Sequence, residues 1–92
     1  MKKRAHVLVS GKVQGVFFRQ NTFQRAKKLG LFGWVCNTKD GRVEAVFEGE
    51  EEKIKEILEW IKIGPPLAKV EKVDITWEEF KGEFKDFEIR YF

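Results

Sequence analysis

The sequence predicts an α+β fold of the split βαβ type (βαββαβ), in which an antiparallel sheet carries two helices on one face. Three observations support this prediction. Stretches typical of strands and helices follow one another in the order strand, helix, strand, strand, helix, strand. The two middle strands are joined by Lys39-Asp40-Gly41, a sequence typical of a tight turn. Apolar residues recur at helical spacing in both helical stretches, so each helix has one face to bury.

The first strand is expected over residues 4–10, where an alternating pattern becomes the apolar run Val7-Leu8-Val9. A loop over residues 11–19 leads to a helix expected over residues 20–29, and Gly30 stands where a helix often ends in a left-handed residue. The apolar face of this helix is formed by Thr22, Phe23, Ala26 and Leu29.

Residues 33–38 and 43–48 are rich in strand formers and are expected to form a hairpin. A second helix follows, with Glu50 to Glu52 at its N-terminal turn and Gly64-Pro65-Pro66 at its end. Its apolar face is formed at positions i, i+3, i+4 and i+7 by Ile54, Ile57, Leu58 and Ile61.

A fourth strand is expected from Val70 to Trp77, and a change of phase between Val70 and Val73 indicates a bulge. A polar connection over residues 78–86 follows. Residues 87–91 then alternate between apolar and polar side chains, which predicts a short closing strand.

This order of elements brings two loop ends to one edge of the sheet. A right-handed crossover makes the first two strands parallel, with the third strand between them. The loop after Ser10 and the end of the second strand, near Asn37, therefore emerge at the same edge, roughly 10 Å apart, which is two strand spacings. A gap of that size accommodates a phosphate group on the loop and one water molecule beside the Asn37 amide.

The loop of residues 11–19, Gly-Lys-Val-Gln-Gly-Val-Phe-Phe-Arg, has the features of an anion-binding site. Gly11 and Gly15 can adopt backbone conformations that let successive N–H groups point into one concavity. The first turn of the following helix adds unpaired N–H groups and a partial positive charge. Arg19 brings a guanidinium group whose shape matches two phosphate oxygens. The alternative is a connecting turn with a solvated arginine.

Composition narrows the classes of function. The 92 residues suffice for one domain, residues 1–92, with a single core and a small site. A net charge of +3 attracts small anions but falls short of the basic stripe of a nucleic-acid binder. One cysteine excludes an internal disulfide, and no apolar run is as long as a signal-peptide core or a membrane span. A cytoplasmic protein without a membrane partner is therefore expected, and the 36% of charged residues suggests that it is thermostable.

Few residues are available for nucleophilic or metal-assisted catalysis. The chain holds one Ser, one His and one Cys, and Ser10 and His6 lie on the same face of one strand, which disfavours a catalytic triad. These residues also lack the number and spacing of a zinc site, and no Gly-Lys-Ser or Gly-Lys-Thr follows the loop. Cys36 and Arg42 have the Cys-x5-Arg spacing of cysteine-dependent phosphatases. A hairpin turn is expected between them, so Cys36 is interpreted as a small sheet residue.

What remains is an oxyanion-binding loop, Arg19, and an asparagine that can orient a water molecule but cannot act as a strong base. Such a set suits a substrate with a good leaving group, for which positioning and charge stabilisation suffice. A mixed anhydride between a carboxylic acid and phosphate is such a substrate.

Two stretches of the sequence resemble the signature motifs of the acylphosphatases. Residues 11–19 resemble the family's signature loop, and residues 33–44, Gly-Trp-Val-Cys-Asn-Thr-Lys-Asp-Gly-Arg-Val-Glu, resemble its second motif. Gly64-Pro65-Pro66 falls where the family commonly has the same tripeptide, so the similarity covers essentially the whole chain. The resemblance implies a ferredoxin-like split βαβ sandwich that hydrolyses acyl phosphates to a carboxylate and phosphate without a metal or cofactor. The implied partners are a small-molecule acyl phosphate and inorganic phosphate, as product and inhibitor.

The resemblance also assigns roles to individual residues. It makes Arg19 the catalytic residue that binds the phosphate and Asn37 the catalytic residue that holds the attacking water. In the mechanism proposed for the family, the substrate phosphate itself takes the proton of the water. The substrate-binding cradle would be formed by the backbone N–H groups of Gln14, Gly15, Val16, Phe17, Phe18 and Arg19. The apolar members of the two motifs, expected to be packing residues first, are Val13, Val16, Phe18, Trp34 and Val35.

Two other functions fit the same fold. A split βαβ domain can bind RNA through aromatic residues on the open face of its sheet, but the strand signature of that class is missing, and the aromatic residues here do not gather on one strand. The chain also resembles the acylphosphatase-like domain of hydrogenase-maturation proteins. Because it ends at Phe92 with nothing appended, a stand-alone enzyme is the favoured expectation.

Overall fold

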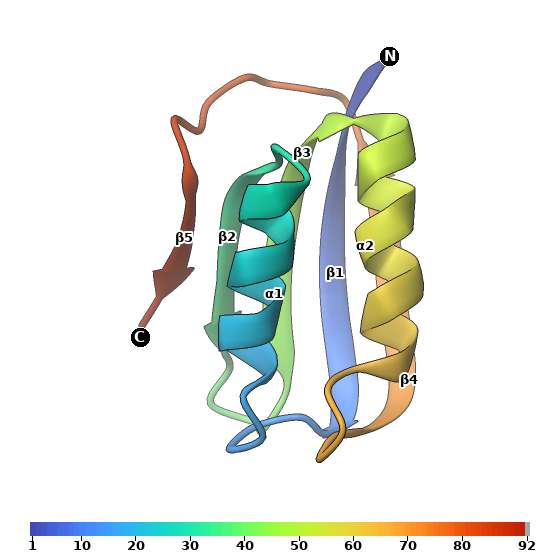
Figure 1. Cartoon of the computed structure of the whole chain (residues 1–92), viewed down its shortest axis with the longest axis vertical. Coiled ribbons are helices and arrows are strands. Elements are labelled where there is room, and N and C mark those ends of the chain that lie inside the picture. The colour runs from blue at the N-terminus through green and yellow to red at the C-terminus, as the bar shows by residue number, and fades with distance from the viewer. Residues whose placement is uncertain (92) are drawn as a thin grey trace.

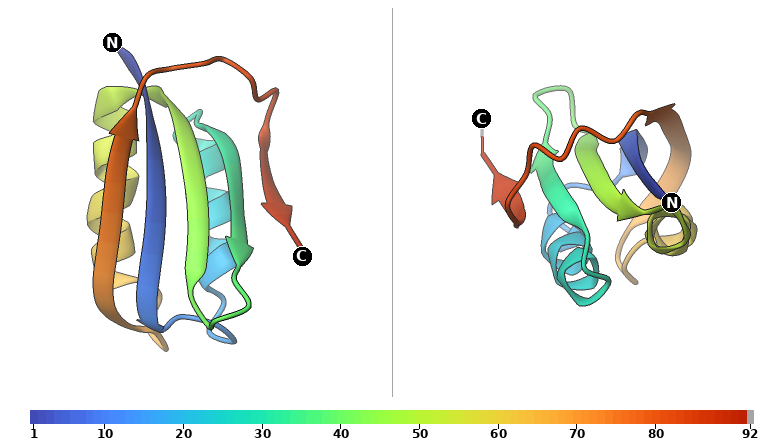
Figure 2. Two further views of the ribbon diagram at one scale, coloured as in Figure 1. Left: turned by 180° about the vertical axis from the view of Figure 1, so that it is seen from behind. Right: turned by 90° about the horizontal axis from the view of Figure 1, so that it is seen from above.

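The computed structural model describes residues 1–91 as two helices packed on a five-stranded sheet (Figure 1). In chain order the elements are β1 (Lys2–Lys12), α1 (Phe18–Lys28), β2 (Phe32–Asn37), β3 (Val43–Glu50), α2 (Glu51–Ile63), β4 (Lys69–Glu78) and β5 (Phe87–Arg90). Both helices cover the same face of the sheet, and the opposite face carries no helix (Figure 2). The predicted α+β fold is therefore confirmed. Among residues 1–91, no helix combines the length and the apolar character needed to cross a membrane.

The strand order in the sheet is β4-β1-β3-β2-β5. β1 and β2 are both antiparallel to β3, so they run parallel to each other with β3 between them, as predicted from the right-handed crossover. β5 adds a parallel neighbour to β2 at the edge, which makes the sheet mixed rather than wholly antiparallel. The reason is the path of residues 79–86, which carry the chain from β4 across the end of the sheet to the opposite edge (Figure 2).

Two element boundaries near the end of β1 differ from the sequence-based expectation. β1 continues through Gly11 and Lys12 because these residues pair with β4. α1 begins at Phe18 and so includes Arg19, which was expected in the loop. The connection between β1 and α1 is therefore shorter than the motif of residues 11–19.

The core lies between the helices and the sheet, where Val13, Val16, Phe18 and Val35 are buried as predicted. The prediction for Trp34 is wrong, since this residue is only half-buried and lies outside the core cluster. Side chains alternate along a strand, so Trp34 and its neighbour Val35 face opposite sides of the sheet. The guanidinium carbon of Arg90 lies 5.3 Å from the centroid of the Trp34 ring.

The bulge predicted between Val70 and Val73 is confirmed. Ser10 pairs with Lys72 and Gly11 pairs with Val70, so one residue of β4 is left without a partner on β1. The extra residue lets both valines pack against the core. Gly11 is required at this point because it has φ 122°, and a Cβ atom there would lie 2.2 Å from a backbone oxygen of β4.

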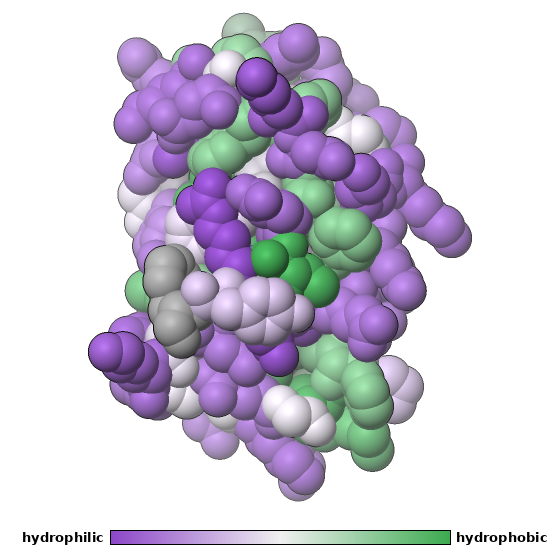
Figure 3. All heavy atoms as spheres, turned by 90° about the vertical axis from the view of Figure 1, so that its left-hand side faces the viewer, coloured by the Kyte–Doolittle hydropathy of each residue, from purple (hydrophilic) through white to green (hydrophobic). Residues whose placement is uncertain are grey.

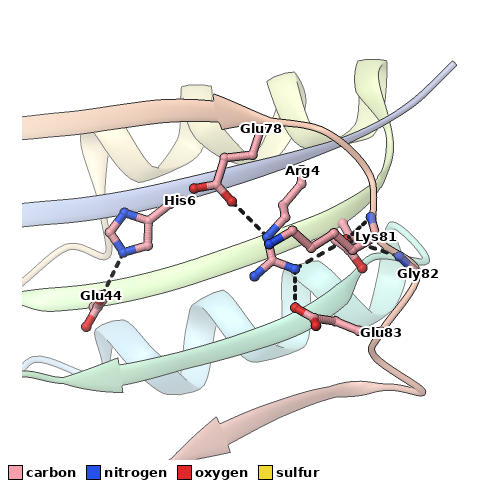
Figure 4. A network of polar contacts seen from close by, with 8 residues as sticks. Arg4, His6, Glu44, Glu78, Lys81, Gly82 and Glu83 are labelled. Atoms are coloured by element: carbon pink, nitrogen blue, oxygen red, sulfur yellow. Dashed lines mark hydrogen bonds and ion pairs between the residues drawn. The ribbon is translucent and has the colours of Figure 1, made fainter.

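Arg4 anchors the connection of residues 79–86 on the open face of the sheet (Figure 4). Its Nε donates to Glu78 at 2.9 Å, and its Nη1 donates to Glu48 at 3.3 Å and to Glu83. Burial of Arg4 disfavours its charged form, but the hydrogen bonds to these three carboxylates outweigh burial and raise its pKa.

Glu48 completes this anchor from β3. The residue is 1% exposed, and its Oε2 also accepts the backbone N–H groups of Lys81 at 2.7 Å and of Gly82 at 3.3 Å. The buried carboxylate therefore ties the connection between β4 and β5 to the centre of the sheet.

Candidate active site

A cavity of about 400 Å³ lies where β1 leads into α1. The residues that line it are Val13, Gly15, Phe17, Phe18, Arg19, Gln20, Asn37, Ile89 and Tyr91. They come from three parts of the sequence: the loop after β1 with the first turn of α1, the end of β2, and β5 with the residue that follows it. On the side of the molecule that carries β5, polar side chains predominate, with smaller apolar areas near the middle and the lower end (Figure 3).

The register of the sheet brings the two predicted catalytic residues together. Val43 of β3 pairs with Val9 of β1 and with Asn37 of β2. Val9 of β1 and Asn37 are therefore two strand spacings apart, roughly 10 Å, and β1 continues past Val9 to Lys12. Arg19, in the first turn of α1, lines the same cavity as Asn37.

The N-terminus of α1 is open to an anion. Phe17 occupies the N-cap position with φ 65°, no side chain caps the helix, and its first turn holds no acidic residue. The N–H groups of this turn and the partial positive charge of the helix end are thus not compensated by a side chain. α2 differs, because Glu51 and Glu52 lie in its first turn. Of the two helix ends, that of α1 is suited to bind a phosphate group.

Arg19 lies half-buried in this first turn. Its guanidinium carbon is 5.2 Å from the ring centroid of Tyr91, and this cation–π contact restricts the orientation of the group. The ion pairs found among residues 1–91 do not include Arg19. The guanidinium is therefore held at the cavity wall with donors available for a phosphate group.

Asn37 contributes a polar atom without a partner. Its side-chain oxygen Oδ1 is buried, and no hydrogen bond to it is formed within residues 1–91. An orphaned acceptor is costly unless a donor satisfies it. Because Asn37 lines the cavity, a water molecule held there can supply that donor.

The structure does not place every predicted site residue at the cavity. Gln14 and Val16 are not among the lining residues, since Val16 is buried in the core and the side chain of Gln14 bonds to the hairpin turn. Conversely, Ile89 and Tyr91 line the cavity although no sequence motif pointed to them. The alternation of residues 87–91 indicated a strand, but no signal indicated that this strand would pair with β2 beside the loop.

The hairpin turn after Asn37 is closed by its own hydrogen bonds. The N–H of Thr38 donates to the carbonyl of Arg42 at 2.8 Å, and Thr38 Oγ1 accepts the N–H of Arg42 at 2.9 Å. Asp40 accepts hydrogen bonds from Arg42 Nε at 2.9 Å and from Thr38 Oγ1. These bonds from Arg42 and Thr38 lower the pKa of Asp40 to about 2. The turn is therefore a firm support for the asparagine that precedes it.

Cys36 lies fully buried in β2, and its burial, followed by the nearby charge of Glu44, raises the pKa of its thiol. The residues between Cys36 and Arg42 form the hairpin turn and lead into β3. They do not form the cradle at a helix start that a cysteine-dependent phosphatase needs. Within residues 1–91, no three His, Cys, Asp or Glu side chains are grouped as metal ligands.

Comparison with known proteins identifies the family, because the sequence model of the acylphosphatases matches residues 5–89. The chain belongs to the acylphosphatase family. An acylphosphatase from Pyrobaculum aerophilum is 56% identical over 87 residues, which are 94% of this chain and 92% of that relative. The crystal structure of acylphosphatase from Bacillus subtilis has a TM-score of 0.93 and 37% identity, and the match covers 99% of this chain and 100% of that chain. Full-length HypF, in its phosphate- and nucleotide-bound form, gives a TM-score of 0.86 at 30% identity, covering 98% of this chain and 12% of that chain.

The protein is thus an acylphosphatase enzyme with a ferredoxin-like fold, and both predictions made from the sequence are confirmed. Acylphosphatases hydrolyse acyl phosphates. The most highly charged part of such a substrate is its phosphate group, which suits a cavity that joins an open helix N-terminus to an arginine.

Proposed function

We propose that the protein hydrolyses acyl phosphates by holding the phosphate group with Arg19 and the backbone N–H groups of residues 14–19, while Asn37 holds the attacking water. One observation carries the proposal. A single cavity joins an uncapped helix end with its arginine to an asparagine whose buried side-chain oxygen lacks a partner. The helix end and the guanidinium of Arg19 fit a doubly charged phosphate group. The side-chain oxygen of Asn37 fits the O–H donor of a water molecule.

The chemistry follows from this arrangement. The water donates one hydrogen bond to Asn37 Oδ1, so a lone pair of its oxygen faces phosphorus. The new P–O bond forms as the bond between phosphorus and the carboxylate oxygen breaks, and the carboxylate leaves with the electron pair. A phosphate oxygen takes the proton of the water, so an acyl phosphate dianion and water give a carboxylate and dihydrogen phosphate. Arg19 and the N–H groups stabilise the charge on the equatorial oxygens.

The proton transfer to the substrate is supported by the composition of the cavity wall. Among the lining residues only Arg19 and Tyr91 have titratable side chains. The lining therefore holds no carboxylate, imidazole or amine, which are the side chains that usually serve as a general base. The proposal needs no metal ion, because the guanidinium and the N–H groups supply the positive charge and the leaving group is a stable carboxylate.

Hydrolysis of benzoyl phosphate by purified protein, with and without EDTA, tests the proposal. We expect turnover that EDTA does not change, with inorganic phosphate as a competitive inhibitor. Arg19→Ala should lower kcat/KM by about 100-fold or more and should also weaken inhibition by phosphate. Asn37→Ala should lower kcat by about 100-fold while the inhibition constant of phosphate stays within about threefold.

Arg25→Ala is the matched control, because Arg25 lies on the same helix and also stacks on an aromatic ring, with its guanidinium carbon 4.5 Å from the centroid of Trp60. It does not line the cavity, so activity should be retained. Activity above half of the native value in Arg19→Ala, or in Asn37→Ala, would contradict the role given to that residue. Loss of turnover in EDTA, restored by a divalent metal, would contradict metal independence.

A further inference from the structure

The side chain of Gln14 connects two segments of the site that lie far apart in the sequence. Its Nε2 donates to the carbonyl of Thr38 at 2.8 Å and to the carbonyl of Arg42 at 2.9 Å. A carboxamide nitrogen has two hydrogens, so both are used. Within residues 1–91, these two bonds are the only hydrogen bonds that join residues 11–19 to the hairpin turn of residues 37–42.

The two carbonyls that Gln14 binds lie at the two ends of one rigid turn. Thr38 and Arg42 are joined by three further hydrogen bonds, and Thr38 directly follows Asn37 in the chain. On its other side, Gln14 precedes Gly15, which begins the left-handed part of the loop with φ 74°. One side chain therefore ties the backbone next to Asn37 to the backbone next to the N-terminus of α1.

The strands alone do not fix this separation. β1 and β2 do not pair with each other, because β3 lies between them, and Asn37 is the last residue of β2. The loop after β1 leaves the sheet at the same edge, so the sheet stops where the two halves of the site begin. Beyond that edge, the bridge made by Gln14 is the direct hydrogen-bonded link between the two halves of the site within residues 1–91.

We propose that Gln14 is a positioning residue of the hydrolysis, which acts by holding the water on Asn37 in line with the phosphate held by Arg19. This inference rests on the function proposed above. Loss of the bridge leaves the helix end, Arg19 and their affinity for phosphate in place, but it lets the hairpin turn drift. A misplacement of about 1 Å can lower a rate by about 100-fold, so the loss should fall on kcat.

The test compares Gln14→Met with native protein in the benzoyl phosphate assay, since methionine has a similar length and no hydrogen-bond donor. We expect kcat to fall by about 10- to 100-fold, with the inhibition constant of inorganic phosphate changed by less than about threefold. Gln24→Met is the matched control, because Gln24 is an exposed glutamine of α1 away from the cavity; its kcat should be unchanged. Circular dichroism of both variants checks folding. If Gln14→Met does not fold, Gln14→Asn replaces it, because asparagine keeps the amide but is too short to reach both carbonyls.

A double-mutant cycle with Asn37→Ala separates positioning from a general structural role. If Gln14 acts through Asn37, Gln14→Met should lower kcat by less than about threefold when Asn37 is already alanine. An equal fold loss in both backgrounds, or a loss confined to phosphate inhibition and KM, overturns the inference. Full activity in Asn37→Ala alone would instead overturn the proposed function, so the two failures are distinguishable.

Discussion

Replacement of Arg4 by methionine should destabilise the fold far more than replacement of an ordinary surface cation. Arg4 is bound to three carboxylates, of which Glu48 is 1% exposed at its side chain, whereas Glu78 and Glu83 are 38% and 49% exposed. Breaking a fully buried ion pair costs about 3–5 kcal/mol. Glu48 keeps two backbone N–H donors in the variant, so the loss of its ion pair with Arg4 should cost about 2–3 kcal/mol of the free energy of unfolding. The loss of each exposed ion pair, with Glu78 and with Glu83, should add at most about 0.5 kcal/mol.

The expected loss is therefore about 3 kcal/mol in the free energy of unfolding, or a fall of about 12–24 °C in Tm. Equilibrium unfolding in guanidinium chloride, followed by circular dichroism, measures it. Lys55→Met is the control, since Lys55 forms an exposed i,i+4 pair with Glu51 whose loss should cost about 0.3–0.5 kcal/mol. Turnover of the folded variant should be unchanged, because Arg4 lies eight residues before Lys12, where β1 ends beside the site, which is roughly 26 Å along the strand.

Two results would refute this reasoning. The first is an equal loss of stability in Arg4→Met and in Lys55→Met. The second concerns the double variant Arg4→Met with Glu48→Gln, in which the amide oxygen still accepts the N–H groups of the connection but no charge is buried. This variant should recover part of the lost stability; no recovery would show that the stranded charge is not the cause.

Three further predictions concern single positions. The carboxyl of Asp40 should titrate near pH 2 in the folded protein. Because this pKa lies below that of the unfolded chain, the ionised carboxylate should stabilise the fold above about pH 4, and this stabilisation should be lost as the pH falls through 2. An NMR titration midpoint near 3.8 would contradict this prediction. Gly33→Ala should lower the free energy of unfolding by more than about 3 kcal/mol, because Gly33 has φ 137° and a Cβ there would lie 1.9 Å from a backbone oxygen of β3. A Cβ at Gly15 would meet nothing within 4 Å, so Gly15→Ala should cost only about 1 kcal/mol. Thermal unfolding measures both losses. Cys36→Ala should retain turnover. The native thiol should resist iodoacetamide until the protein unfolds, because it is fully buried and its pKa is raised. Loss of turnover in Cys36→Ala, or on treatment of the folded protein with iodoacetamide, would indicate that Cys36 takes part in catalysis.

The sequence predicted those features that local pattern and strand topology determine. The order of elements placed Asn37 beside the loop because the side-chain periodicity and the handedness of the crossover leave one arrangement of the first three strands. The bulge could be predicted because Val70 and Val73 are three residues apart, whereas side chains on one face of a regular strand are separated by an even number of residues. These signals lie within one element or between neighbouring elements.

The features that the sequence did not reveal depend on contacts across most of the chain. Tyr91 reaches Arg19 only because residues 79–86 cross the end of the sheet and deliver β5 beside β2. That path is held by Arg4, whose partners lie 44 to 79 residues away in the chain. The bridge made by Gln14 spans 24 and 28 residues and ends on carbonyl groups, which carry no side-chain identity that a sequence pattern could show.

The site also runs against the preferences that stabilise the rest of the fold. A cation near a helix N-terminus is unfavourable by about 0.3–1 kcal/mol, yet Arg19 stands in the first turn of α1, while α2 follows the rule with Glu51 and Glu52. Asn37 buries an oxygen without a partner, and Phe17 adopts a left-handed conformation that costs about 1–2 kcal/mol. Under the proposed function, a hydrated phosphate group would offset two of these costs: the anion would satisfy the guanidinium and the helix end, and its water would satisfy the amide oxygen. The cation in the first turn of α1 and the unpartnered oxygen of Asn37 therefore share one explanation only if phosphate and water bind together in this cavity.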